Sequence, residues 1–260
     1  MSAFSFDPAN QVTAGLTSET VETLQSRSSV RSFLSRPISD DLLATILRAS
    51  CHAPTSSNIQ AYSIIVVRDA ATKRELAELA GKQAHVAAAP VFLLICGDLS
   101  RAERACRIHG REFVGNTFEM GLVAAVDASL VGMSIMVCAE SLGLGCVMIG
   151  GVRNHPVQIA HLLHLPPRAF AVFGMCLGWP AERPLQKPRM PDGSVIHFEC
   201  YDTAKTDRVL AEYDQILNEY YKQRGSGDSE SWTERISKEF SRPRRPDLRA
   251  NLEALGLPFE

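Results

Sequence analysis

The sequence predicts an α+β fold in which helices flank a mixed central sheet. Four short apolar runs, rich in β-branched residues, have the length and composition of buried strands. They lie at residues 62–67, 91–96, 146–149 and 169–177. Segments with helical spacing separate them, and this alternation is typical of a sheet covered by helices, in an α/β or an α+β arrangement. A chain of 260 residues, 45% of them hydrophobic, can bury such a sheet in one core.

Capping residues mark where the helices begin. Ser39 precedes Asp40 and Asp41, which places a hydroxyl and two acidic side chains at the positive end of a helix dipole. Apolar residues then recur at helical spacing until Pro54 ends the segment. Residues 99–116 have the composition of polar connecting material. Further helices are expected at residues 69–79, 84–89, 156–163 and 203–222.

The segment from Met120 to Ala139 is apolar and long enough to span a membrane, with Asp127 as its one charged residue. Asp127 near the middle, the many small residues and the lack of a basic flank all argue against a transmembrane helix. A helix buried on all sides is the better interpretation. A 260-residue monomer seldom needs a buried helix of this length, so the segment also indicates an oligomer whose core includes it.

The charge balance argues against nucleic-acid binding. The chain has 27 Lys and Arg against 29 Asp and Glu, a net charge of −2, whereas binding through phosphates needs a surplus of cations. No basic residue precedes Arg27, so a secretory signal is not expected and the predicted location is cytoplasmic. The seven cysteines are scattered without a Cys-x-x-Cys pair, and most are expected to be small buried hydrophobes.

Common catalytic templates are missing. Gly143 and Gly145 lack the third glycine of a dinucleotide fingerprint, and Gly81-Lys82 lacks the flanking residues of a P-loop. His161 and His164 supply two metal ligands at most, and there is no Gly-x-Ser-x-Gly elbow. We therefore expect neither a resident metal nor a serine nucleophile.

Four weak clusters remain, and each has a purely structural alternative. In Arg27-Ser28-Ser29-Val30-Arg31, guanidiniums and hydroxyls suit phosphate oxygens, but a surface turn fits equally well. The polar run from Pro54 to Gln60 fits an ordinary loop. Gly150-Gly151 follows a predicted strand, where it either lets a flat ligand approach the backbone or forms a tight turn. Lys187-Pro188-Arg189 is a weak signal for an anion clamp.

These clusters occur in one order along the chain, together with further motifs. The motifs are Gly81-Lys82-Gln83-Ala84-His85-Val86, Ala139-Glu140-Ser141-Leu142-Gly143-Leu144-Gly145, Ile149-Gly150-Gly151-Val152-Arg153-Asn154, Phe173-Gly174-Met175-Cys176-Leu177-Gly178-Trp179-Pro180 and Tyr220-Tyr221-Lys222-Gln223-Arg224-Gly225-Ser226. The order resembles the flavin-dependent nitroreductase family, and within it the NADPH-preferring, oxygen-insensitive branch that includes NADPH flavin reductases. The resemblance runs from about Ser26 to Pro243.

The resemblance implies the nitroreductase α+β fold and an obligate homodimer with FMN at the subunit interface. A shared interface would account for the long apolar helix. We expect a single nitroreductase-like domain over residues 1–260. It would include an extended, proline-rich connector at about 179–202 and a peripheral C-terminal arm at about 203–260, for whose last residues, 244–260, no role is predicted.

By position, the resemblance also implies a set of cofactor-binding residues. Arg27, Ser28 and Ser29 would hold the FMN phosphate with Lys187 and Arg189, and Arg31 would lie near the N1 and O2 edge of the flavin. Gln83 would bond the ribityl chain or ring edge, and backbone amides near Gly150 and Gly151 would reach N5. The full predicted set is Arg27, Ser28, Ser29, Arg31, Thr55, Ser56, Ser57, Gln83, Ile149, Gly150, Gly151, Arg153, Lys187 and Arg189, with Thr55, Ser56 and Ser57 reaching the ring of the other subunit.

The implied chemistry belongs to the flavin, so no catalytic acid or base is assigned to the protein. NADPH, or NADH, would deliver a hydride in a ping-pong cycle, and flat acceptors such as nitroaromatics, quinones, chromate or free flavin would be reduced by two electrons. Arg224, Ser57 and Arg242 are the residues expected to meet NADPH or substrate.

Two features depart from the branch and leave alternatives open. Ser28 stands where a basic residue is usual, and Asp228 and Glu230 follow Arg224 where relatives place further arginines. These acids would repel the 2'-phosphate of NADPH, so NADPH is favoured over NADH only modestly. Two alternative functions remain: a flavin reductase that supplies reduced FMN, and a non-catalytic flavin-binding or redox-responsive partner protein.

Overall fold

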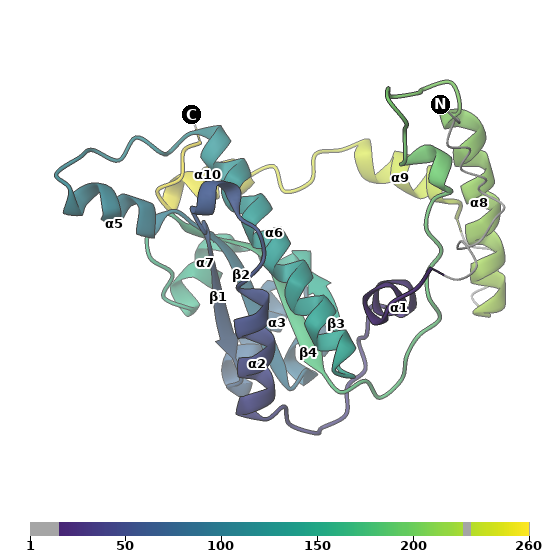
Figure 1. Cartoon of the computed structure of the whole chain (residues 1–260), viewed down its shortest axis with the longest axis horizontal. Helices are drawn as coiled ribbons and strands as arrows, with labels where there is room; N and C mark the ends of the chain where they lie inside the picture. The colour runs from purple at the N-terminus through teal and green to yellow at the C-terminus, as the bar shows by residue number, and fades with distance from the viewer. Residues whose placement is uncertain (1–15, 226–229, 260) are drawn as a thin grey trace. The chain divides into compact units, whose positions relative to one another are not determined.

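The computed structural model describes residues 16–225 and 230–259 (Figure 1). Residues 1–15, which include most of the segment tested for a secretory signal, and Asp228 lie outside the described residues. The chain divides into two compact units. The sheet unit contains residues 23–184 and 245–260, and the arm unit contains residues 1–22 and 185–244. Each unit is described by itself.

The sheet unit contains four strands in the order β1-β2-β4-β3. They are β1 (Tyr62–Val67), β2 (Val91–Asp98), β3 (Gly145–Ile149) and β4 (Ala169–Gly178), which confirms the four predicted runs. All three pairings are antiparallel. One parallel bridge, between Ser29 and Cys146, extends the β3 edge, so the mixture of strand directions is confined to this edge. The central strands β2 and β4 carry the longest runs of buried residues because they are paired on both sides.

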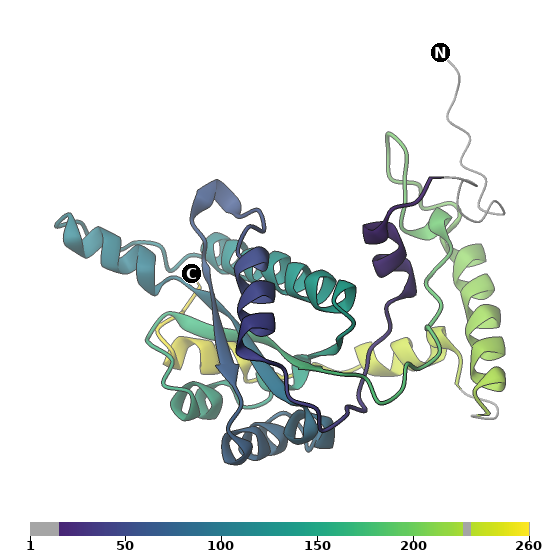
Figure 2. The same ribbon diagram turned by 60° about the horizontal axis from the view of Figure 1, so that its bottom comes forward.

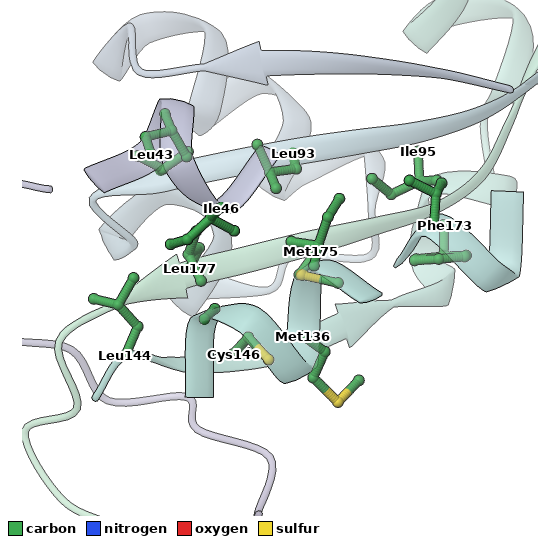
Figure 3. Packing of buried hydrophobic residues seen from close by; sticks show 14 of the residues in the cluster. Leu43, Ile46, Leu93, Ile95, Met136, Leu144, Cys146, Phe173, Met175 and Leu177 are labelled. Carbon is green, nitrogen blue, oxygen red and sulfur yellow. The ribbon is translucent and has the colours of Figure 1, made fainter. Parts of the chain in front are cut away.

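Two layers of helix cover the sheet (Figures 1 and 2). On one face, α2 (Asp40–Ser50) and α6 (Phe118–Ser141) pack on Leu93 and Ile95 of β2. Figure 3 shows these strand residues with Leu43 and Ile46 of α2 and Met136 of α6. On the other face, α3 (Ala70–Leu79), α4 (Ala84–Ala88) and α7 (Pro156–Leu162) cover the alternate residues of β2, namely Phe92, Leu94 and Cys96. This alternation follows from the period of two along a strand.

The long helix α6 begins at its Thr117 cap, whose hydroxyl accepts a hydrogen bond from the Met120 amide. One face of the helix is buried in the sheet unit, while Phe118, Leu122, Val126, Leu130 and Met133 are exposed. Burial on all sides was predicted together with an oligomer, so for the exposed face it stays a prediction. Among the described residues, α6 is the one helix long and apolar enough to cross a membrane, and half of its most apolar window is buried. This burial is typical of a core helix.

Four of the α-helices that the structure describes were not expected from the sequence, of which two lie near the C-terminus and two precede α6 in the chain. One of the two before α6 is α5 (Ser100–Ile108), which occupies the predicted connecting segment at residues 99–116. Asp98 accepts hydrogen bonds from the Ser100 amide and hydroxyl, at 2.9 and 2.6 Å, and so satisfies donors at the start of this helix. The other is α1 (Glu19–Ser26). Both helices are short and polar and neither has a buried residue, so neither has the long apolar stripe by which a helix is usually predicted.

The last residues of the chain are part of the sheet unit. Helix α10 (Leu248–Ala254) packs beside α7, and Leu257 is fully buried with Leu99 and Phe170. The Arg168 amide donates to the Leu255 carbonyl at 2.9 Å. Residues 245–259 are thus fastened to the core by both apolar and backbone contacts.

The arm unit is built on α8 (Thr206–Gln223), which confirms the predicted helix at residues 203–222, and on α9 (Trp232–Phe240). Tyr213, Leu217 and Tyr220 form its small apolar cluster, with Trp232 packed against it. Asp214 of α8 accepts a hydrogen bond from the Thr233 amide at 3.0 Å, which fixes the start of α9 to α8.

Candidate functional site

The Gly150-Gly151 turn follows directly on the end of β3 and opens the short 3-10 helix η2 (Gly150–Arg153). A Cβ atom on Gly151 would lie 2.1 Å from the Ala80 carbonyl oxygen and 2.6 Å from Nε2 of Gln83. These distances are too short for any side chain, so glycine is required there by packing. The turn is pressed against the segment that carries Gln83, and the two predicted flavin-binding elements lie together.

His85 adds an unmet polar atom to this neighbourhood. Its Nε2 is buried and has no hydrogen-bond partner among the described residues. Burial lowers the pKa of His85, and the positive charge of Arg31 lowers it further. His85 is therefore neutral near pH 7. A buried polar atom without a partner calls for an explanation, and a bound ligand supplies one.

The Arg27–Arg31 segment runs along the β3 edge. The Val30 amide donates to the Cys146 carbonyl at 3.0 Å, and the buried Val30 side chain occupies the space that a Cβ on Gly145 would need. Nη2 of Arg27 donates to the Ser29 hydroxyl at 3.3 Å, and Nη1 of Arg31 contacts the Ser29 carbonyl at 3.5 Å. The segment that carries these two guanidiniums is thus fixed by its backbone beside the start of β3.

Arg153 contributes a third guanidinium beside the turn. It donates to the Val172 carbonyl of β4, and its Nη2 lies 3.3 Å from the position of a Cβ on Gly150. Arg27 and Arg31 belong to the segment paired with the start of β3, so the three guanidiniums together make the β3 edge, from its start to the turn, cationic. Arginine forks match the oxygens of phosphate, so the arrangement suits an anionic ligand that also has a flat part to lie on the glycine turn.

The loop that carries Thr55, Ser56 and Ser57 is held at α6 by a buried carboxylate. Oδ1 of Asp127 accepts a hydrogen bond from the Ser56 amide, and Oδ2 accepts one from the Ala61 amide, both at 2.9 Å. Asp127 is fully buried. Both carboxylate oxygens are therefore committed to the backbone of this one loop.

The loop backbone is strained. Ser57, Asn58 and Gln60 have φ angles of 46°, 56° and 54°, values in the left-handed region that cost residues with a side chain about 1 kcal/mol or more each. The Arg101 guanidinium donates to the Gln60 carbonyl at 2.8 Å, so the far end of the loop is also held. Strain imposed by surrounding contacts is frequent at binding sites.

The predicted residues of the arm unit make contacts within that unit. Nζ of Lys187 donates to the Tyr221 hydroxyl at 2.8 Å, and Nη1 of Arg189 donates to the Lys187 carbonyl at 2.8 Å. Nη1 of Arg224 donates to the Tyr220 hydroxyl at 3.3 Å. Arg242 is exposed.

Glu230, one of the two acids expected to oppose NADPH, forms a salt bridge with Lys238. Asp228, the other acid, lies outside the described residues. The Lys238 ammonium compensates the negative charge of Glu230. Glu230 therefore no longer counts as one of the two acids expected to repel the 2'-phosphate of NADPH.

The structure places one set of predicted residues along β3 and at the turn that follows it, and places another elsewhere. Arg27, Ser29 and Arg31 lie along the β3 edge, and Gln83 and Arg153 contact the glycine turn. Ser56 is fixed instead by α6.

Three residues that belong to the candidate site or hold its segments were not predicted from the sequence, although two of them had a recognisable sequence signal. Asp127 was visible as a lone charge in an apolar helix, and His85 lies within a motif quoted for the resemblance. Arg245, which bonds the Gly150 carbonyl, had no sequence signal.

Other chemistry is not apparent in the described part of the chain. No group of three or more His, Cys, Asp or Glu side chains there is placed to hold a metal ion. All seven cysteines are free. Only Cys96, Cys146 and Cys176 are buried, and Cys51 and Cys200 are exposed, so the expectation that most cysteines are buried was wrong.

Comparison with known proteins identifies the family to which the chain belongs. The model of the Nitroreductase family matches residues 24–179, and that of the Nitroreductase family, C-terminal domain, matches residues 187–260. The chain therefore belongs to the nitroreductase family, as its resemblance predicted.

Relatives match over nearly their whole length. The FMN reductase [NAD(P)H] of Bacillus subtilis is 37% identical over 93% of this chain and 99% of the relative. The oxygen-insensitive NADPH nitroreductase of Salmonella typhimurium is 36% identical over 92% of this chain and 98% of the relative.

Solved structures agree on the fold. A hypothetical oxidoreductase from Bacillus subtilis superimposes with a TM-score of 0.91 at 36% identity, covering 94% of this chain and all of the other. The NADPH:FMN oxidoreductase of Vibrio harveyi, solved with NAD+, gives a TM-score of 0.84 at 34% identity with the same coverage. The predicted nitroreductase fold is confirmed.

Proposed function

We propose that this protein is an FMN-dependent NAD(P)H oxidoreductase that reduces flat acceptors such as nitroaromatics, quinones or free flavin. The observation that carries the proposal is the cationic edge of β3 together with the glycine turn that follows the strand. There, Arg31, the neutral His85 and the Gly150-Gly151 turn lie together in a chain whose full-length relatives are named as FMN reductases and NADPH nitroreductases. The protein contributes the surroundings of the flavin and supplies no catalytic acid or base.

The residues along β3 and around the turn that follows it fit FMN in three respects. The buried Nε2 of His85 has no partner among the described residues and can bond a ligand atom. Glycine at position 151 is enforced by packing against Ala80 and Gln83, which holds the turn next to Gln83, itself a predicted flavin-binding residue. Arg27, Arg31 and Arg153 supply the positive charge that a phosphate and a reduced flavin require.

The roles of single residues follow from this fit and from the family resemblance. Arg27, Ser28 and Ser29 would bind the phosphate, and Arg31 would stabilise negative charge at the N1 and O2 edge of the ring. Amides of the Gly150-Gly151 turn would donate to N5. When bound, FMN would take a hydride from the nicotinamide and pass two electrons to the acceptor. The contributions of Lys187, Arg189 and Arg242 stay predictions of the resemblance.

We also propose that two copies of the chain associate through α6. Phe118, Leu122, Val126, Leu130 and Met133 recur every three or four residues, so they form one apolar stripe along the exposed side of the helix. Exposed apolar stripes of this kind are typical of subunit interfaces. In such a dimer, Thr55, Ser56 and Ser57 would reach the flavin of the other subunit, which agrees with their separate anchoring at α6.

NADPH is the favoured donor. Arg224 is an exposed cation held over the Tyr220 ring, and the opposing Glu230 is paired with Lys238. The Arg224 guanidinium is thus available to meet a 2'-phosphate that NADH lacks. The relatives suggest a soluble protein, and we propose that it acts in the cytoplasm.

The test is to purify the protein, record its flavin spectrum, and follow oxidation of NADPH and NADH with a nitroaromatic, a quinone and free FMN. We expect a yellow protein that oxidises NADPH faster. A colourless protein that takes up no FMN would contradict the proposal. A yellow protein bleached by neither nucleotide would favour the non-catalytic flavin-binding alternative. Turnover with free FMN alone would favour the flavin reductase that supplies reduced FMN.

A further inference from the structure

The C-terminal segment returns to the glycine turn at the end of β3. Nη2 of Arg245 donates to the Gly150 carbonyl at 3.3 Å, and its Nε donates to Oδ1 of Asn154 at 2.9 Å. The Asn154 amide in turn donates to the Gly151 carbonyl at 2.9 Å. One guanidinium thus holds both ends of the turn that the proposed function places against the flavin.

The bond to the Gly150 carbonyl also determines the direction of the next amide. A trans peptide is planar, so the carbonyl of Gly150 and the N–H of Gly151 point to opposite sides of one rigid plane. Glycine on both sides of this peptide leaves its rotation unrestrained by side chains. A partner that fixes the carbonyl oxygen therefore fixes the N–H, and a cationic donor also polarises the peptide and strengthens that N–H as a donor.

Arg245 is well placed to act as such a restraint, because its segment is anchored. Leu257 is fully buried, and Nη1 of Arg168 donates to the Gly256 carbonyl at 3.1 Å. The Leu248 amide donates to the Arg245 carbonyl at 3.0 Å, which closes a turn directly after Arg245. Arg245 itself has a φ of 49°, an unfavourable conformation that its surroundings must maintain.

We propose that Arg245 is a positioning residue for the flavin: it orients the Gly150-Gly151 peptide so that the Gly151 N–H is presented to the ring. The proposal rests on the proposed function, since it assumes FMN at this turn. It gives the otherwise unassigned C-terminal segment a role in the flavin site, carried out by a residue that does not itself touch the reacting atoms.

The test compares Arg245→Ala, Arg245→Lys and the control Arg249→Ala. Arg249 is an exposed arginine on the same segment whose Nε pairs with Glu253, so its loss removes the same charge without touching the turn. FMN is titrated into flavin-free protein, and amide hydrogen exchange of residues 149–154 is measured before FMN is added. We expect Arg245→Ala to raise the FMN dissociation constant about tenfold and to speed exchange at the turn. Arg249→Ala should change neither.

The visible spectrum at saturating FMN distinguishes a positioning role of Arg245 from a merely structural one. Hydrogen bonds to the flavin ring nitrogens tune its electronic properties, so we expect the visible band to shift in Arg245→Ala and to return in part in Arg245→Lys. Wild-type affinity in Arg245→Ala, or weakened binding with an unshifted band, would overturn the proposal while the proposed function stands. If the wild-type protein takes up no FMN, both fail together.

Discussion

Asp127 offers the most quantitative test of how this structure is held together. Its two carboxylate oxygens each accept one backbone amide hydrogen bond at 2.9 Å, from Ser56 and Ala61, and the side chain is fully buried. Replacing it with alanine removes the acceptor of two amide donors, one of which belongs to the buried Ala61. Hydrogen bonds to a charged group contribute about 1.5–3 kcal/mol each, so Asp127→Ala should lower the free energy of unfolding by about 3–5 kcal/mol.

The variant Asp127→Asn keeps one of the two hydrogen bonds accepted by Asp127 and removes the other. The amide keeps one acceptor oxygen, but its NH2 group now faces a backbone N–H, so one hydrogen bond becomes a clash of two donors. We expect a loss of about 2 kcal/mol, close to half of the alanine effect. Because the loop carries Ser56 and Ser57, FMN binding should weaken in both variants.

The assay is urea denaturation of flavin-free protein at one fixed concentration, so that neither ligand nor assembly changes between variants. Asp69→Ala is the matched control. Asp69 is an exposed carboxylate that accepts one backbone hydrogen bond at 2.7 Å, from Thr72 at the start of α3, and its removal should cost about 1 kcal/mol. If Asp127→Ala costs no more than Asp69→Ala, the account of Asp127 as the anchor of the loop is wrong.

Four further predictions address the site and the assembly. Arg224→Ala should raise the KM for NADPH at least tenfold and that for NADH much less, and equal effects in steady-state kinetics would remove Arg224 from 2'-phosphate recognition. Gly151→Ala should abolish FMN uptake, measured by titration, because its Cβ would lie 2.1 Å from the Ala80 oxygen, whereas Gly150→Ala, whose nearest neighbour is the Nη2 of Arg153 at 3.3 Å, should retain binding. Because the pKa of His85 is lowered in the folded protein, the unfolded chain binds more protons as the pH falls below about 6.5, and stability should decline there; His85→Gln should flatten that slope in urea titrations, and an unchanged slope would assign it to other groups. Val126→Arg should convert a dimer to a monomer in light scattering, and an unchanged mass would exclude the α6 stripe as the interface.

The sequence predicts the sheet well because its signals are local. Residues 91–96 and 169–177 form nearly continuous apolar runs, and the two central strands β2 and β4 occupy them. Ser39 with Asp40 marked the start of α2, and the structure shows the Ser39 hydroxyl accepting the Leu42 amide. Composition and spacing are enough to predict a strand or helix where the whole segment lies in one kind of environment.

The sequence fails where a residue's role depends on contacts distant in the chain. Asp127 argued only against a membrane span, because nothing local shows that it bonds amides more than 60 residues away. Arg245 looked like one cation in a basic arm, and only the folded chain brings it to Gly150. Helix α5 is short and strongly polar and has no buried residue, so its composition is that of connecting material.

The candidate site is likewise predicted from the sequence only in part. The family resemblance found Arg31, Gln83 and the Gly150-Gly151 turn, but their meeting at one end of β3 is a property of the fold. The unmet Nε2 of His85 could be recognised only once its burial was known.

The central claim is tested most directly by one anaerobic titration. NADPH is added in steps to the FMN-saturated protein while the visible flavin absorbance is followed. The account predicts that one equivalent of NADPH per bound FMN bleaches the band completely, and that a quinone added afterwards restores it. A band that persists in excess NADPH and in excess NADH would contradict the account, because the bound flavin would then take no hydride from either donor.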